Sequence, residues 1–241
     1  MNILRNLHTI SYVIMSPPVE PPPSLKEMDL RLKCFFTMLV SGPSNSGKTT
    51  FVKNLLIRRN VLYDKPPRKV FWFYKVYQHM YDDMLRLNIV HEFIEGMCTM
   101  DWLEANLNDD QDNCTIVMDD MAMEATEDTA KIFSVGAHHA KVNVIFICQN
   151  LFTRNKYFRD ISLNSTYLVL FKNVRDKQQI TSLAKQFAPG KVKEFVKIYY
   201  AATKLPHSYL MLNYHQETLE EHRLLSNILL ENNKPIELYI L

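Results

Sequence analysis

The first residues whose types and spacing could do chemistry are Gly42 to Thr49, which follow the pattern G-x-x-x-x-G-K-T. The glycines let consecutive backbone N–H groups curve around phosphate groups, and a helix that begins there adds the positive end of its dipole. Lys48 is then placed to meet β- and γ-phosphate oxygens, and the Thr49 hydroxyl to ligate Mg²⁺. The pattern predicts a loop that binds ATP and Mg²⁺, with contacts from Gly42, Pro43, Ser44, Asn45, Ser46, Gly47, Lys48, Thr49 and Thr50.

The segments on either side of this loop have the character that a phosphate-binding loop needs. Residues 34–41 are mostly apolar and predict a buried strand, and residues 49–59 predict a helix. The whole chain has only five glycines in 241 residues, so two of them at the required positions argue against a chance match. We therefore expect nucleotide binding.

A pair of acids follows another apolar run and could complete such a site. Thr115 to Met118 precede Asp119 and Asp120. An acid at the carboxyl end of a strand can bind Mg²⁺ directly or through water, which is the role expected for Asp119 beside Thr49. Asp120 is the candidate to polarise the attacking water. Many hydrolases have Glu at this position, and the alternative is that Asp120 caps a helix or forms a turn.

The strand predicted over residues 142–148 ends in two amides, Gln149 and Asn150. In the P-loop enzymes that include helicases and motor ATPases, a strand lies between those that carry the loop lysine and the acids. Its polar terminal residue senses the γ-phosphate. Gln149 is our first choice for this role and Asn150 the second, and a simple turn at the strand end is the alternative.

Three arginines lie around the next predicted strand: Arg154, Arg159 and Arg175. An arginine that neutralises charge on the γ-phosphate accelerates hydrolysis by about 10³–10⁵-fold, and supply from a neighbouring subunit would couple hydrolysis to assembly. Alternatively, Arg154 caps a helix and Arg175 pairs with Asp176. We expect one of the three to act on the phosphate.

The pattern of the remaining chain predicts an α/β fold, with a mostly parallel sheet flanked by helices, because strands and helices alternate. The expected strands beyond residues 34–41 cover residues 69–74, 89–93, 114–120, 142–148, 166–171, 209–214 and 237–240. The other expected helices cover residues 81–87, 101–107 (capped by Asp101), 124–140, 177–187, 191–200 and 219–230.

Prolines at 17, 18 and 21–23 divide the chain. They predict that residues 1–30 form a loose extension with a proline-rich linker. Residues 31–241 are expected to form one P-loop domain, in which about 201–241 are a C-terminal elaboration.

The composition is typical of a globular protein without a membrane-spanning helix. Apolar residues make up 47% and charged residues 22%, which fits a globular chain, and no apolar stretch approaches the ~20 residues of a membrane span. No signal peptide is evident, and the four cysteines show no paired or metal-binding spacing, so we expect an intracellular, non-secreted protein. Residues 154–197 hold ten basic and three acidic side chains, which could form a surface for phosphates or a solvated helix surface.

Taken together, these motifs resemble the viral genome-packaging ATPases of the FtsK–HerA superfamily, especially the compact forms of poxvirus-like viruses and Polinton/Maverick-type elements. The resemblance is carried by segments within residues 34–190: 42–51, 116–120, 147–150, and Arg159 with 164–167. It implies a RecA-like core, a homo-oligomeric ring (often a hexamer), and DNA-stimulated, Mg²⁺-dependent ATP hydrolysis. That hydrolysis would translocate double-stranded DNA into a preformed capsid at its portal vertex, at the virion assembly site in a host cell. It also implies Arg159 as the arginine supplied to the neighbouring subunit.

Two other functions remain open from the sequence. A P-loop nucleoside or nucleotide kinase could use the three arginines as a lid, although a kinase needs no water-activating acid such as Asp120. A non-motor, NTP-dependent assembly factor would need the same nucleotide site but a protein partner. Stimulation of phosphate release by DNA or by a nucleoside acceptor separates these functions.

Overall fold

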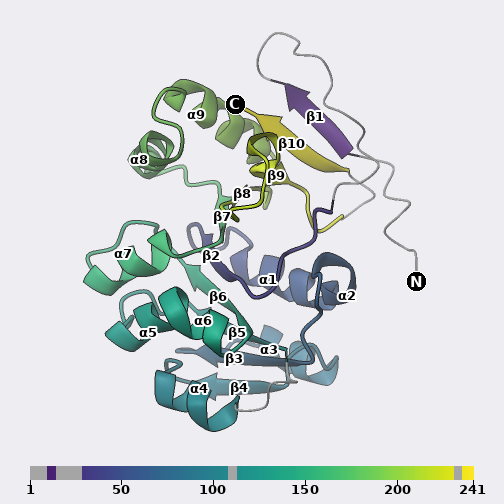
Figure 1. Ribbon diagram of the computed structural model, residues 1–241, viewed down its shortest axis with the longest axis vertical. Helices are drawn as coiled ribbons and strands as arrows, with labels where there is room; N and C mark the ends of the chain where they lie inside the picture. Colours follow the sequence, from purple (N-terminus) through teal and green to yellow (C-terminus); the bar gives the residue numbers. More distant parts are fainter. Residues whose placement is uncertain (1–9, 15–28, 108–112, 231–234) are drawn as a thin grey trace.

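A ten-stranded sheet forms the centre of the computed structural model, which describes residues 10–14, 29–107, 113–230 and 235–241 (Figure 1). The order across the sheet is β1-β10-β9-β8-β7-β2-β6-β5-β3-β4. The strands are β1 Ile10–Ile14, β2 Thr37–Ser41, β3 Lys69–Tyr74, β4 Glu92–Glu95, β5 Cys114–Asp119, β6 Val142–Cys148, β7 Tyr167–Phe171, β8 Tyr209–Asn213, β9 Leu224–Ser226 and β10 Ile236–Ile240. The proline-rich stretch lies outside the described residues.

The six strands from β7 to β4 pair in parallel, which confirms the expected mostly parallel α/β sheet. β8, β9 and β10 extend it in antiparallel pairing. Parallel strands buried on both faces read as continuous apolar runs, and β2, β5, β6 and β7 are buried at every position. This is why the sequence marked these strands clearly.

Helices cover both faces of the sheet (Figure 1). α1, α2 and α3 pack with one apolar cluster, and α4 to α9 pack with a second cluster on the other face. The helices are α1 Lys48–Ile57, α2 Arg59–Leu62, α3 Met80–Arg86, α4 Met100–Asn106, α5 Glu127–Lys131, α6 Ala137–His139, α7 Lys156–Leu163, α8 Lys177–Phe187 and α9 Val192–Ala202. A π-helical turn, Ile132–Gly136, joins α5 to α6, so the helix expected over 124–140 is shorter and interrupted.

The prediction of a helix over residues 219–230 is wrong. Only Glu220–His222 forms a short 3-10 turn, and Leu224–Ser226 is β9, paired with β8 and β10. Asn227 and Leu230 have positive φ angles of 57° and 53°, which a right-handed helix does not contain. Leu224–Ser226 bond the neighbouring strands instead, and local turns satisfy backbone groups on either side of them.

Three smaller differences concern two element ends and one strand that was not expected. The strand expected at 89–93 is β4, Glu92–Glu95. α4 is capped by Thr99, whose side chain accepts a bond from the Trp102 N–H, and Asp101 lies within its first turn instead of capping it. β1, in the segment where the sequence indicated no element, pairs in parallel with β10.

Candidate nucleotide-binding site

The loop of residues 42–47 lies between the end of β2 and the start of α1, as the sequence predicted. The Gly42 N–H donates to the Cys148 carbonyl at 3.3 Å, which ties the loop to the end of β6. A Cβ on Gly42 would lie 2.6 Å from the Cβ of Phe171, so only glycine fits there. Asn45 and Gly47 have φ angles of 62° and 102°. The loop is therefore closely packed at its base and left-handed at two positions near its tip.

Lys48 is the first residue of α1 and is only 8% exposed. Its Nζ donates to the Pro43 carbonyl at 2.9 Å, so the ammonium group lies across the loop. Burial lowers the pKa of Lys48, while the charges of Asp120 and Asp119 raise it. The side chain is thus held in the loop.

Thr49 and Asp119 come together although they are 70 residues apart. Thr49 Oγ1 lies 3.5 Å from Asp119 Oδ2, and Asp119, the last residue of β5, is 4% exposed. The Tyr81 hydroxyl donates to the same Oδ2 at 2.9 Å. Burial raises the pKa of Asp119 to about 6, and the bond from Tyr81 opposes that shift. A hydroxyl and a carboxylate are hard oxygen ligands of the kind Mg²⁺ prefers.

Asp120 and Gln149 also meet. Gln149 Nε2 donates to Asp120 Oδ2 at 2.8 Å, and both residues are exposed. Asp120 has a φ of 58°, and its N–H donates to the Ile147 carbonyl at 3.0 Å. This left-handed turn directs its side chain to the neighbouring strand end. The second candidate, Asn150, instead accepts a bond from Gln179 Nε2 at 3.2 Å.

The sheet order explains why these groups converge. β6 lies between β2 and β5, as the sequence predicted for the strand that carries Gln149. Parallel strands end at the same edge, so the loop, the acids and the amide share the carboxyl edge of the sheet. The sequence could predict this arrangement because the loop, the two acids and Gln149 each come at the end of an apolar run.

The three arginines do not join this cluster within one chain. Arg154, Arg159 and Arg175 are exposed, and within the described part of the chain none of their side chains bonds to the loop, Asp119 or Asp120. Arg159 lies on α7. The cap of α7 is Asn155, whose side chain accepts from the Tyr157 N–H, so Arg154 does not cap it.

Asp176 was the alternative partner for Arg175, but its carboxylate caps α8. Asp176 Oδ1 accepts bonds from the Gln178 and Gln179 N–H groups. No ion pair between Arg175 and Asp176 is present among the described residues. Both structural roles weighed for Arg154 and Arg175 are therefore absent from this part of the chain.

The structure brings two further residues to the site that the sequence did not indicate. Tyr81 of α3 is fully buried and bonds Asp119. His207, in the loop before β8, places Nδ1 3.1 Å from the Ser46 carbonyl. Both contacts span distant parts of the chain, and a tyrosine on the buried side of a helix reads as a core residue. No local pattern marks either one.

The remaining observations concern membranes and metals. None of the helices in the described ranges combines the length and apolar character needed to cross a bilayer. Within the same ranges, no three or more His, Cys, Asp or Glu side chains gather as a metal site.

Comparison with known proteins gives structural likeness only. No family model matches the sequence, and no curated protein matches it. The structure is similar to the genome packaging NTPase B204 of Sulfolobus turreted icosahedral virus 2 in complex with ATP-gammaS, at 10% identity and a TM-score of 0.52, over 76% of this chain and 94% of that one. The AMP complex of that protein gives 11% identity and a TM-score of 0.52, over 79% and 96%.

The DNA-packaging ATPase B204 of Sulfolobus turreted icosahedral virus is likewise similar, at 10% identity and a TM-score of 0.50 over 76% and 94% of the two chains. At this identity the likeness concerns the fold. This chain has the α/β fold of a P-loop NTPase, in the form seen in B204. The loop of residues 42–47 lies between β2 and α1, and the sheet is mostly parallel.

Proposed function

We propose that this protein is a Mg²⁺-dependent ATPase that acts as a motor, translocating double-stranded viral DNA into a preformed capsid. One observation carries the proposal: Lys48, Thr49, the two aspartates and Gln149 meet at one edge of the sheet. The likeness to B204, a genome packaging NTPase solved with ATP-gammaS, supports the nucleotide and the biological role.

The loop fits a polyphosphate on an observation of its own. Ser46 Oγ is buried and has no hydrogen-bond partner among the described residues. A buried hydroxyl without a partner is costly, and a phosphate oxygen beside the loop would satisfy it. Lys48, held across the loop, adds positive charge where the β- and γ-phosphates would lie.

Thr49 and Asp119 are the residues that would hold Mg²⁺. When bound, Mg²⁺ neutralises charge that develops on the transferred phosphoryl group. Asp119 is kept in place by the Tyr81 and Thr49 hydroxyls, which both contact its Oδ2. This arrangement fixes the carboxylate before any ligand arrives.

Asp120 and Gln149 would act on the attacking water. Asp120 accepts its proton, and Gln149 orients both the carboxylate and the water towards the γ-phosphate. Arg159 would come from the neighbouring subunit of a homo-oligomeric ring, which we propose to be a hexamer, because within the described residues neither it nor Arg154 or Arg175 bonds the cluster of its own chain. DNA would be held by basic surfaces such as that of residues 154–197, and the ring would dock on the capsid portal inside the host cell.

The test is ATP hydrolysis measured over a range of protein concentrations, with and without duplex DNA. A motor that shares catalysis between subunits gains specific activity as the concentration rises and gains more with DNA, and added salt weakens the DNA effect. Phosphate transfer to a nucleoside, with no effect of DNA, would replace the motor by a kinase. Hydrolysis insensitive to both DNA and concentration would favour an assembly factor.

A further inference from the structure

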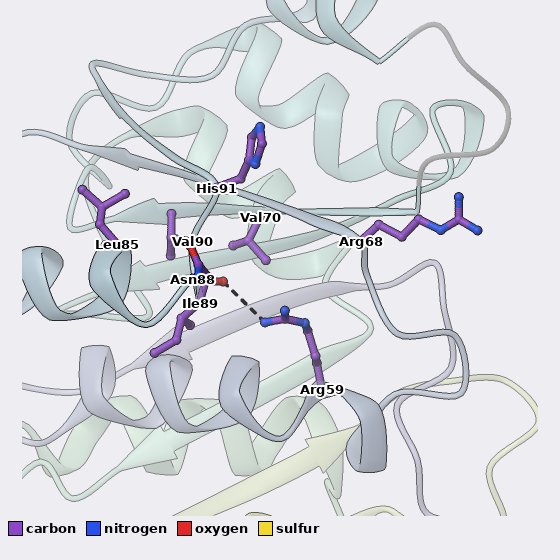
Figure 2. Close-up of a pocket in the computed structure, with 8 residues that line it drawn as sticks. All are labelled: Arg59, Arg68, Val70, Leu85, Asn88, Ile89, Val90 and His91. Atoms are coloured by element: carbon purple, nitrogen blue, oxygen red, sulfur yellow. Dashed lines mark hydrogen bonds between the residues drawn. The ribbon is translucent and has the colours of Figure 1, made fainter. Parts of the chain in front are cut away.

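A pocket of about 280 Å³ lies at the start of β3, at the edge of the sheet opposite to Asp119 (Figure 2). It contains Arg59, Arg68 and His91, three groups that could meet an anion. Figure 2 shows that these groups do not converge: Arg68 extends away from the other labelled residues, and Arg59 bonds the Ile89 carbonyl. We assign this pocket no ligand.

A network of hydrogen bonds at the carboxyl edge of the sheet connects α8 to the end of β6. Its centre is Gln179, in the first turn of α8. Gln179 Oε1 accepts a bond from the Leu151 N–H at 3.2 Å, and Gln179 Nε2 donates to Asn150 Oδ1, also at 3.2 Å. Both partners follow directly on Gln149, which we propose to orient the attacking water.

The Gln179 amide is held in one orientation by the helix that carries it. Asp176 caps α8 through Oδ1, and its Oδ2 accepts a bond from Gln179 Nε2 at 2.8 Å. Exchange of the amide oxygen and nitrogen would set the NH₂ group against the Leu151 N–H and the oxygen against the Asp176 carboxylate. The amide therefore reaches Leu151 with its acceptor and cannot turn over.

The loop that precedes α8 is fixed to the buried part of the protein. Asn173 Oδ1 accepts bonds from the Arg175 and Asp176 N–H groups, at 3.1 and 3.0 Å. The Asn173 N–H donates to the Tyr199 hydroxyl at 2.7 Å. Tyr199 is fully buried, and its hydroxyl donates to the Phe171 carbonyl at 3.0 Å. The start of α8 is thus anchored to the end of β7.

This network spans the loop of residues 42–47. β2 lies between β6 and β7, so the network joins the two strand ends on either side of that loop. Gly42, at the base of the loop, touches both of them. Its N–H donates to the Cys148 carbonyl at 3.3 Å, and a Cβ on it would lie 2.6 Å from the Phe171 Cβ. The end of β6 is therefore fixed from α8 as well as from its own sheet neighbours.

Of the two bonds from Gln179 to the end of β6, the one to Leu151 restrains the main chain. Leu151 is 4% exposed, so an N–H group there that lost its acceptor would be costly. The bond to Asn150 reaches only a side chain. A shift of the main chain at Leu151 would move Gln149, two residues earlier, away from Asp120, which it bonds at 2.8 Å.

We propose that Gln179 is a positioning residue for ATP hydrolysis, which holds the chain at Leu151 and so keeps Gln149 against Asp120. In this role Gln179 contacts neither the nucleotide nor the attacking water and acts only through Gln149. The role rests on the function proposed above, because Gln149 needs to be aligned only if the site hydrolyses ATP.

The experiment measures steady-state ATP hydrolysis by the full chain and its equilibrium binding of a slowly hydrolysed ATP analogue. Gln179→Met keeps a long side chain of similar helix propensity but removes the hydrogen bonds. We expect kcat to fall about 10-fold, since misplacing an aligned group slows the chemical step, while the analogue affinity stays within about twofold. Gln178→Met, which alters the neighbouring exposed amide of α8, is the matched control and should change neither quantity.

A combination with Gln149→Ala separates this positioning role from a general structural one. If Gln179 acts through Gln149, Gln179→Met should lower kcat by less than about twofold when Gln149 is already replaced. Gln179→Asn has an amide one methylene shorter, which cannot reach Leu151. It should behave like Gln179→Met and takes its place if that variant does not fold.

Wild-type kcat in the Gln179 variants would overturn the proposal while leaving the ATPase intact. Losses that multiply in the double variant would overturn it too, because Gln179 would then act independently of Gln149. Weaker analogue binding with unchanged kcat would assign Gln179 to the support of the loop instead and equally reject the proposal. Failure of the wild type to hydrolyse ATP would instead reject the proposed function.

Discussion

Gln149 and Asp120 end neighbouring strands and share one hydrogen bond, from Gln149 Nε2 to Asp120 Oδ2 at 2.8 Å. The bond occupies one carboxylate oxygen and leaves the other available to a water molecule. Asp120 reaches this position through a left-handed backbone, with a φ of 58°. A turn residue and a catalytic base are thus compatible roles for Asp120, because the turn itself aims the carboxylate.

This relationship predicts that the two side chains act as a unit. Asp120→Asn should lower kcat about 100-fold or more, since an amide cannot take a proton from water, while ATP binding is kept. Gln149→Ala should lower kcat about 10-fold or more with little change in ATP affinity. The double variant should lose less than the product of the single losses, because each change already breaks the pair.

The matched control is Asn150→Ala, which alters the adjacent exposed amide that bonds Gln179 instead. Steady-state phosphate release and equilibrium binding of a slowly hydrolysed ATP analogue provide the two measurements. Losses that multiply in the double variant would show that Gln149 and Asp120 act separately.

The burial of Asp119 leads to the prediction that Asp119→Asn makes the folded protein more stable, by an amount that depends on pH. Burial raises its pKa in the folded protein to about 6, from 3.8, so the native state holds a proton that the unfolded chain releases. The free energy of unfolding should therefore fall as the pH rises from about 4 to 6, and stay lowered above it by about 3 kcal/mol. Asp119→Asn, which carries no charge, should escape this penalty.

We therefore expect Asp119→Asn to be more stable than wild type at pH 7.5 and similar to it below pH 4, in urea titrations without divalent cations. The same variant should need more Mg²⁺ for hydrolysis, since a neutral ligand holds the cation less well. A variant less stable than wild type at both pH values would show that the buried charge is not the dominant cost.

The close packing around Gly42 leads to the prediction that any side chain at this position clashes with its neighbours. A Cβ there would lie 2.6 Å from the Phe171 Cβ and 2.8 Å from Ser46 Oγ, so Gly42→Ala forces the loop or β7 to move. We expect a loss of about 1–3 kcal/mol in the free energy of unfolding and at least 10-fold weaker nucleotide binding. Gly190→Ala, with no atom within 4 Å of the added carbon, is the control and should leave both unchanged.

The sequence identified the strands of the parallel core well for a physical reason. β3 and β6 match their predicted limits because each is a mostly apolar run that is largely buried in the sheet. The same reasoning failed at residues 219–230. There the leucines at 224, 225, 229 and 230 imitate helical spacing, while the three residues of β9 gain their backbone bonds from strands on both sides.

The candidate site was predictable only where its residues lie at or just beyond the end of a strand. Asp119 ends β5, Gln149 follows β6, and Lys48 begins the helix after the loop that follows β2, so the order of the sheet brings them together. Tyr81 and His207 reach the site from a helix and a loop, 38 and 161 residues away from the groups they contact. Contacts of this kind depend on tertiary packing, so no local spacing reports them.

The last prediction is that Arg159 acts on the nucleotide of a neighbouring subunit. Arg159 is exposed on α7, and within the described residues its side chain bonds neither the loop nor the acids. Arg159→Ala alone should lower turnover about 10³-fold or more, and Lys48→Ala alone should abolish it, because each homo-oligomer then lacks one half of every site. Mixing the two variants should restore partial activity, since an Arg159→Ala subunit keeps its own Lys48 and gains an intact arginine from its neighbour. Arg154→Ala alters an exposed arginine five residues earlier. It is the control and should retain activity without mixing.

Recovery in the mixture of Arg159→Ala and Lys48→Ala should grow with total protein concentration as mixed assemblies form. Absence of recovery at any ratio, with specific activity independent of concentration, would place the arginine in the same chain as its nucleotide and reject shared catalysis.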